Sequence, residues 1–254
     1  MPAEAMEFII DVTIFLYGII IGSFLNVCIF RIPKSESILP DSHCRNCGHK
    51  LRWYDLFPVF SYILLRGRCR YCGNRISLQY PLVEVCNGIL YVIVYKANGL
   101  NVESILFCLM TSALIVISVI DERTFEIPVG CNIFLAGLGI ISCIYDYVHI
   151  WEHVIGAICV SLILYLLFLL SGGQAIGGGD VKLMAAAGLL LGWKKITLAF
   201  FLGCILGSVI HLVRMRISKK EHVLAMGPYL SAAIYLCALW GDMAIEWYLK
   251  QLQI

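Results

Sequence analysis

The chain has 254 residues, of which 60% are hydrophobic and 14% are charged. An ordinary soluble domain carries about 25% charged residues. A compact soluble protein of this length needs more polar groups to cover its surface, so the composition excludes a soluble globular enzyme, a disordered chain and a nucleic-acid-binding domain. It indicates a polytopic membrane protein. Residues 31–80 hold nine Lys/Arg and three Asp/Glu, so a single polar insert interrupts the apolar chain.

Apolar runs along the chain predict the membrane-spanning segments, because a transmembrane helix needs about 20 mostly apolar residues. Eight runs meet or approach this length, and the second and the sixth are short. In chain order they are 8–30, 82–96, 102–120, 129–148, 154–171, 181–193, 196–217 and 227–249. The sequence therefore predicts an all-α polytopic membrane protein with about eight transmembrane helices.

Charges around the first run predict the orientation of the chain. Glu4 and Glu7 precede this run and Arg31 and Lys34 follow it, so we expect an uncleaved anchor with its N-terminus outside rather than a signal peptide. The inner side then carries 15 Lys/Arg and the outer side four, as the positive-inside rule requires. Topology and anionic lipid headgroups both explain the basic insert, which gives no reason to expect nucleic acid.

Small residues recur along one face of the first run. Gly18, Gly22 and Asn26 are spaced four apart. This spacing favours close packing against another helix. Docking of a substrate helix on the same face is the alternative.

Four of the twelve cysteines form two CxxC pairs in the polar insert, Cys44/Cys47 and Cys69/Cys72. The pairs are 21 residues apart, and a glycine follows each pair directly. Zinc prefers four such thiolates in a closed tetrahedral site, so the spacing predicts a structural zinc ion. We expect the eight other cysteines to be small buried residues of the helices.

Two alternatives to zinc stay open for these cysteines. The first alternative is disulfide bonding, which is rare on the reducing inner side of a membrane. The second is an iron–sulfur or redox role. A 50-residue insert has little core, so a metal would supply much of its folding free energy. We expect His43 and His49, which flank the first pair, to be neighbours of the site rather than ligands.

Two aspartates stand at predicted inner ends of membrane helices, where a charged group is costly. Asp121 follows the third run and Asp180 precedes the sixth, so the topology places both on the inner face. We expect the glycines at 177–179 to adopt backbone conformations that other residues avoid and to let another segment approach closely. Taken singly, each aspartate also fits a helix N-cap or a solvated loop acid.

Taken together, the two aspartates predict an aspartic protease. Two carboxylates held close in a partly dry site do not both ionise readily, so the pair shares a proton. The ionised member takes a proton from a water molecule that attacks a carbonyl carbon, and the protonated member donates to the carbonyl oxygen. In the sequence, no Ser-His-Asp set, HExxH motif or phosphate-binding loop competes with this pair.

Several segments, in chain order, resemble the type IV prepilin peptidases, the membrane leader peptidases of type IV pili, type II secretion and competence pili. Segment 22–33, GSFLNVCIFRIP, resembles the opening GSFLNVxIxRxP motif of this family. The two CxxC pairs and segment 76–84, ISLQYPLVE, look like its cytoplasmic loop, although the first pair lacks the proline that often follows the first cysteine. Asp121 followed by Ile127-Pro128 is similar to the first catalytic motif.

Two later segments complete the resemblance. Segment 177–183, GGGDVKL, matches the GxGDxKL motif, and segment 227–230, GPYL, resembles the family's last-span FGPYL. The resemblance implies a set of site residues with three roles. These are Asp121 and Asp180 as catalytic residues, Gly177, Gly179, Lys182 and Pro128 as motif support, and Cys44, Cys47, Cys69 and Cys72 as zinc ligands.

The resemblance also implies substrates, a compartment and a second activity. The substrates are prepilins or pseudopilins, cut after glycine on the cytoplasmic side of the inner membrane and just before a hydrophobic helix. Members with the cysteine loop typically methylate the new N-terminus with S-adenosylmethionine. No segment independently indicates where this methyl donor binds.

These inferences divide the chain into three regions: a first transmembrane helix at 1–30, a cytoplasmic tetracysteine insert at 31–80 and a transmembrane aspartic protease core at 81–254. Two other functions stay open. A metal transporter that uses the cysteines is disfavoured, because no central span carries a row of ligands. A membrane-anchored zinc-ribbon adaptor predicts that 31–80 alone retains function.

Overall fold

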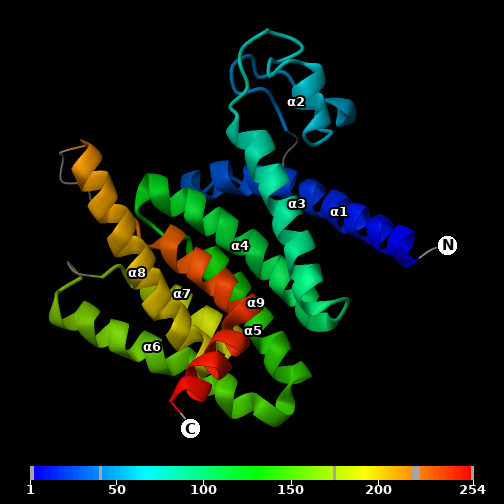
Figure 1. Cartoon of the computed structure of the whole chain (residues 1–254). Coiled ribbons are helices and arrows are strands. Elements are labelled where there is room, and N and C mark those ends of the chain that lie inside the picture. Colours follow the sequence, from blue (N-terminus) through cyan, green and yellow to red (C-terminus); the bar gives the residue numbers. More distant parts are fainter. Residues whose placement is uncertain (1–2, 40–41, 174–175, 219–223, 253–254) are drawn as a thin grey trace. The chain divides into compact units, whose positions relative to one another are not determined.

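The computed structural model describes residues 3–39, 42–173, 176–218 and 224–252 (Figure 1). The regular secondary structure of the described residues is helical. They contain two isolated β-bridges but no strand. Each of the eight predicted spans coincides with a helix. Five helices are long and apolar enough to cross a membrane, and Val129–Tyr145 is a shorter apolar helix. The all-α membrane fold is therefore confirmed. The chain divides into two compact units, Met1–Gly99 and Leu100–Ile254.

The first unit consists of two long helices joined by the polar insert. Helix α1 spans Ala3–Arg31 and helix α3 spans Gln79–Asn98. In the part of the insert that the structure describes, three short helical elements occur: η1 at Ile32–Lys34, η2 at Trp53–Asp55 and α2 at Phe60–Leu64.

Glycines bring α1 and α3 into close contact. A Cβ on Gly18 would lie 2.6 Å from Cα of Gly88, and one on Gly22 would lie 2.7 Å from Cα of Glu84. The side chain of Asn87 donates a hydrogen bond to the main-chain oxygen of Gly18 at 2.7 Å. The small-residue face of α1 is thus filled by α3, which confirms the helix-packing interpretation and leaves no room there for a substrate helix.

The same contacts decide where the first unit ends. The predicted third region, 81–254, begins inside α3, whereas the structure groups α3 with α1 because these two helices pack so closely. The boundary between the two units therefore falls at Gly99, at the end of α3.

A buried carboxylate fastens the insert to α3. Glu84 is 5% exposed, and its Oε2 accepts a hydrogen bond from the N–H of Val59 at 2.7 Å. Val59 has a φ of +60°, which is a strained conformation for a β-branched residue. The contact with Glu84 holds this strained turn directly before α2.

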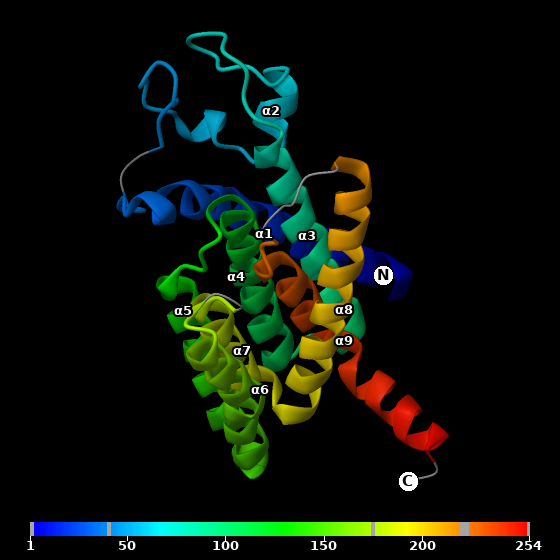
Figure 2. The same cartoon turned by 90° about the vertical axis from the view of Figure 1, so that its left-hand side faces the viewer.

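In the second unit, the described residues form a bundle of six helices with one short 3₁₀ element, η3, at Tyr147–His149. In chain order the helices are α4 (Val102–Thr124), α5 (Val129–Tyr145), α6 (Ile150–Leu170), α7 (Gly178–Leu191), α8 (Trp193–Ser218) and α9 (Gly227–Gln251). Figure 2 shows α5, α6 and α7 side by side, and α8 packs along α9.

Helix α7 is short because its neighbours enclose it. Its 14 residues give it a length of about 21 Å, less than the ~30 Å of a bilayer core. It packs against α5, α6 and α8, and half of its residues are buried. A helix in this position is shielded from lipid by protein, so it need not reach both membrane surfaces.

Two facing glycines set the distance between α6 and α7. A Cβ on Gly188 would collide with the main-chain oxygen and carbon of Gly156, and a Cβ on Gly156 would lie 2.7 Å from the main-chain carbon of Gly192. Main-chain atoms cannot move aside as a flexible side chain can. The crossing therefore requires glycine at both positions.

This crossing yields a stability prediction. We expect Gly188→Ala to lower the free energy of unfolding by about 3 kcal/mol, because the methyl group forces α6 and α7 apart. The matched control is Gly137→Ala in α5, where an added Cβ meets nothing within 4 Å. This change should stabilise the helix by about 1 kcal/mol. Thermal unfolding of the detergent-solubilised proteins measures both effects, and equal unfolding temperatures would contradict the packing argument.

Candidate active site

Asp121 lies in the last turn of α4 and is almost fully buried. The residue is 5% exposed, and its Oδ2 accepts a hydrogen bond of 2.8 Å from the N–H of Gly227, the first residue of α9. A Cβ at position 227 would come within 2.6 Å of this same oxygen, so the contact requires glycine. A helix N-terminus also carries partial positive charge, which favours a carboxylate there. The alternative interpretation of Asp121 as a solvated acidic residue in a loop is therefore wrong.

Asp180 is the third residue of α7 and is partly buried. The N-cap of this helix is Gly177, and the N–H of Asp180 donates to the oxygen of Gly177 at 3.1 Å. The N-cap alternative for Asp180 is therefore wrong, because Gly177 is the N-cap and the helix begins at Gly178, two residues before Asp180. Its carboxyl group lies close to Gly177, at the start of the helix.

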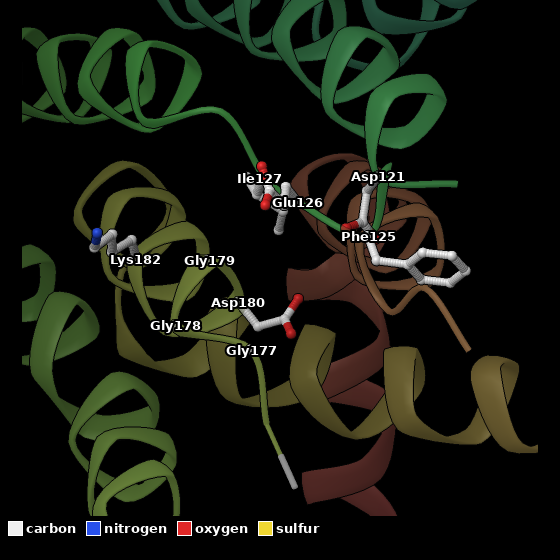
Figure 3. A pocket seen from close by; sticks show the side chains of 9 residues that line it. All are labelled: Asp121, Phe125, Glu126, Ile127, Gly177, Gly178, Gly179, Asp180 and Lys182. Carbon is white, nitrogen blue, oxygen red and sulfur yellow. The ribbon is translucent and has the colours of Figure 1, made fainter. Parts of the chain in front are cut away.

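One pocket receives both aspartates. Its volume is about 250 Å³, and the residues that line it come from the end of α4, the loop before α5 and the start of α7. They are Asp121, Phe125, Glu126, Ile127, Gly177, Gly178, Gly179, Asp180 and Lys182. Figure 3 shows the carboxyl groups of Asp121 and Asp180 facing this pocket from two different helices.

The glycines before Asp180 are needed because there is no space for side chains, and not because the backbone has an unusual conformation. A Cβ on Gly179 would lie 2.9 Å from Cβ of Ile127, and a Cβ on Gly177 would lie 3.0 Å from Oδ2 of Asp180. The expected close approach of another segment is thus confirmed at Gly179. The expected unusual backbone is wrong, because Gly177 has an ordinary φ of −71° and no positive φ occurs at 177–179.

The two remaining motif residues occupy different places. Pro128 is the N-cap of α5, with φ −61° and ψ 131°, and it ends the loop whose residues 125–127 line the pocket. Lys182 lies at the edge of the pocket, and in Figure 3 its side chain points away from both carboxyl groups. Lys182 is therefore not paired with either aspartate.

The four cysteines of the insert come together as one cluster. The Sγ atoms of Cys44, Cys47, Cys69 and Cys72 all lie within 4.8 Å of one another. This is a compact set of soft ligands that could hold a metal ion in a closed site.

The two CxxC segments have the same backbone geometry. In the first, the N–H of Cys44 donates to the oxygen of His49 and the N–H of Gly48 donates to the oxygen of Cys44. The second repeats this pattern from Cys69 and Gly73. Both glycines have positive φ, +69° and +70°, as the tight turn requires. Each CxxCG segment therefore forms a tight turn, a knuckle, that brings its two cysteines together.

The disulfide alternative loses support. All twelve cysteines lie within the described residues, and each of them is free, so the structure has no disulfide. His49 belongs to the surroundings of the cluster, since its ring packs on Tyr71 with the ring centres 3.6 Å apart.

Asp55 holds the second knuckle in place. Its carboxylate accepts hydrogen bonds from Nε of Arg70 at 2.7 Å, the hydroxyl of Tyr71 at 3.1 Å and the N–H of Arg52 at 3.2 Å. Burial alone would raise the pKa of this carboxyl, but these bonds, with the one from Arg70 the largest, hold the pKa below its usual range. The carboxylate thus stays ionised at neutral pH, and its contribution is lost only as the pH falls through this lowered pKa.

Sequence reasoning missed the partner of Asp121. The GPYL segment was recognised from its resemblance, but nothing in its letters indicates that the N–H of Gly227 bonds to a residue 106 positions away. Phe125 was missed too. It ends α4 in the left-handed conformation, with a φ of +55°, and so turns the chain into the pocket loop.

The chain is similar to known proteins along most of its length. Residues 16–97 match the bacterial peptidase A24 N-terminal domain, and residues 108–212 match the type IV leader peptidase family. The chain is 33% identical to the prepilin leader peptidase/N-methyltransferase of Pseudomonas putida, covering 93% of this chain and 92% of that protein. The protein of the same name from Neisseria gonorrhoeae is 32% identical, with 91% of this chain and 92% of that protein covered.

No solved structure matches the chain significantly. The two matched regions lie one in each compact unit, and together they contain the four-cysteine cluster and both aspartates of the pocket. This chain therefore belongs to the type IV leader peptidase family.

Proposed function

We propose that this chain removes the leader peptide from type IV prepilins or pseudopilins, with Asp121 and Asp180 as its catalytic pair, and N-methylates the new N-terminus. One observation carries the proposal: two aspartates 59 positions apart face one pocket in a member of this family. Relatives with up to 33% identity are named prepilin leader peptidase/N-methyltransferase.

The reaction needs one water molecule and one shared proton. The ionised aspartate removes a proton from the water as it attacks the carbonyl carbon of the scissile peptide bond, while the protonated aspartate donates to the carbonyl oxygen. The aspartate that took a proton from the water then donates a proton to the leaving nitrogen, and the C–N bond breaks as the tetrahedral intermediate collapses. The N–H of Gly227 supports this chemistry, because it fixes the orientation of the Asp121 carboxylate.

The membrane orientation follows from the same residues. We infer an inner-membrane protein with its N-terminus outside, and with the insert, Asp121 and Asp180 on the cytoplasmic side. The bias of 15 inner against four outer Lys/Arg supports this, although Lys219 and Lys220 of that count lie outside the described residues. A second support is that two predicted inner connections, 121–128 and 172–180, and the start of the last predicted span meet around Asp121 within the second unit.

Zinc and S-adenosylmethionine are the proposed cofactors. The cluster of Cys44, Cys47, Cys69 and Cys72 fits a structural zinc ion, since it offers four thiolates and no open position for a substrate. Residues 31–80 then form a cytoplasmic zinc-binding insert. S-adenosylmethionine would supply the methyl group for the new N-terminus, and we assign no residue to its binding.

The catalytic pair is tested by conservative substitution. Asp121→Asn keeps an oxygen for the N–H of Gly227 but cannot act as a base, so we expect cleavage of a purified prepilin to slow by about 1,000-fold or more. Asp180→Asn should have the same effect. In both cases the unfolding temperature should stay near that of the wild type.

The matched control is Glu122→Gln, which removes the neighbouring negative charge. Glu122 is exposed and pairs with Arg214 at 2.8 Å on the surface, where such pairs contribute about 0–1 kcal/mol. This variant should cleave at nearly the wild-type rate. Wild-type cleavage by either aspartate variant would disprove the catalytic assignment.

The zinc assignment is tested by metal analysis of the purified protein. We expect one zinc ion per chain in the wild type and loss of this ion in Cys44→Ser and Cys72→Ser, because a closed tetrahedral site needs all four thiolates. Cys86→Ser changes a cysteine of α3 outside the cluster and should retain the metal. A full equivalent of zinc in Cys44→Ser would show that the cluster is not the site.

A further inference from the structure

The polar insert exposes a group of large apolar side chains on and beside α2. Phe60, Ile63 and Leu64 share one face of this short helix, and the ring of Phe57 packs edge-on against that of Phe60 with the ring centres 5.9 Å apart. All four residues are more than half exposed, and Leu64 reaches 81%. Exposed apolar side chains that lie together in this way mark a surface that binds something. We call these four residues the apolar patch.

The rest of α2 shows the opposite arrangement to a helix on a water-facing surface. Ser61 is 7% exposed, and its hydroxyl donates to the main-chain oxygen of Phe57 at 2.6 Å. Tyr62 is partly buried, and its hydroxyl donates to the oxygen of Ile76 at 3.4 Å. The polar groups of α2 are thus used inside the insert, while its large apolar groups face outward. This inversion indicates apolar surroundings.

A hydrogen bond holds the turn before α2 beside the long helices of the first unit. The N–H of Val59 donates to Oε2 of Glu84, the sixth residue of α3. The main chain of Glu84 lies against Gly22 of α1, nine residues before the end of that helix. Helix α1 is one of the five that are long and apolar enough to cross a membrane. The turn that carries the apolar patch therefore lies beside the second turn of α3, at the level of a membrane-spanning segment.

A hollow next to the patch combines apolar and basic residues. Its volume is about 590 Å³, and it is lined by His49, Lys50, Leu51, Arg52, Trp53 and Leu56. Leu56 directly precedes the patch, and Trp53 is 78% exposed. Tryptophan is enriched at membrane–water interfaces, and basic residues there attract anionic headgroups. The one acidic residue of segment 49–66, Asp55, is already paired with Arg70.

We propose that the insert docks on the bilayer, with the apolar patch in the headgroup region and the hollow at Trp53 holding the headgroup of an anionic phospholipid. Both ends of the insert are joined to long helices, α1 and α3, so the bilayer surface is always at a high local concentration. A segment with apolar side chains on one side and basic residues beside them binds such a surface. The insert is thus a membrane-contacting element as well as a carrier of the four-cysteine cluster.

The contact of the patch is tested with a photoreactive side chain in the whole chain. The amino acid p-benzoylphenylalanine replaces Leu64 in one variant, and in the matched control it replaces Asn74, an exposed residue of the second CxxC turn. Both proteins are reconstituted in phosphatidylcholine vesicles and irradiated, and mass spectrometry of their peptides identifies what each probe captures. We expect the probe at 64 to gain the mass of one phospholipid and the probe at 74 to gain none.

The headgroup preference is tested with the same probe in place of Trp53. In vesicles of equal parts phosphatidylcholine and anionic phosphatidylglycerol, we expect capture of phosphatidylglycerol in about fivefold excess or more, the effect of one or more basic residues near a charged surface. Lys50→Gln combined with Arg52→Gln should bring this ratio close to one. Both residues are exposed, so the unfolding temperature of this variant should stay near that of the wild type.

Three results would overturn the proposal. Capture of another segment of the chain, or of a second chain, by the probe at 64 would show that the patch is a protein-docking surface. The same yield of lipid at 64 and 74 would show that the patch makes no preferred contact with the bilayer. Equal capture of the two lipids at 53 would show that the hollow is no anionic headgroup site. The vesicles carry the same lipids in both leaflets, so each result is independent of the membrane orientation and of leader cleavage.

Discussion

The hydrogen bond between the N–H of Gly227 and Asp121 is the contact on which the pocket depends. A carboxylate that is almost fully buried needs a hydrogen-bond donor. The first N–H of a helix has no partner within the helix, so it can provide this hydrogen bond. This bond joins the end of α4 to the start of α9, two helices that pack along each other. It also explains why position 227 admits no side chain, since a Cβ would occupy the space of the carboxylate oxygen.

The opposite wall of the pocket is set by close helix packing. Gly179 lets the loop before α5 touch the start of α7, and the glycine contact between Gly156 and Gly188 holds α7 against α6. Asp180 therefore lies on a helix that other helices enclose.

The insert of the first unit is held together by local turns and polar contacts rather than by close helix packing. An insert with little core is organised by two similar turns, the ion pair of Asp55 with Arg70 and the hydrogen bond from Val59 to Glu84.

Much of this arrangement follows from the sequence, because its strongest signals are local. Apolar runs predict the helices, and CxxC spacing predicts the knuckles. The alternation of inner and outer connections predicts that Asp121 and Asp180 lie on the same side of the membrane. The remainder depends on contacts between distant residues. Apolar patterning does not indicate that α3 belongs with α1, since this grouping comes from Gly18, Gly22 and Gly88 meeting face to face.

The central claim is that Asp121 and Asp180 together activate one water molecule for peptide hydrolysis. Its most direct test is mass spectrometry of a prepilin digested in water enriched with oxygen-18. The account predicts that the wild-type protein releases a leader peptide with one heavy oxygen in its new carboxyl group, and that no leader is released by Asp121→Asn or Asp180→Asn. Release of the labelled leader by either variant at the wild-type rate would contradict the account.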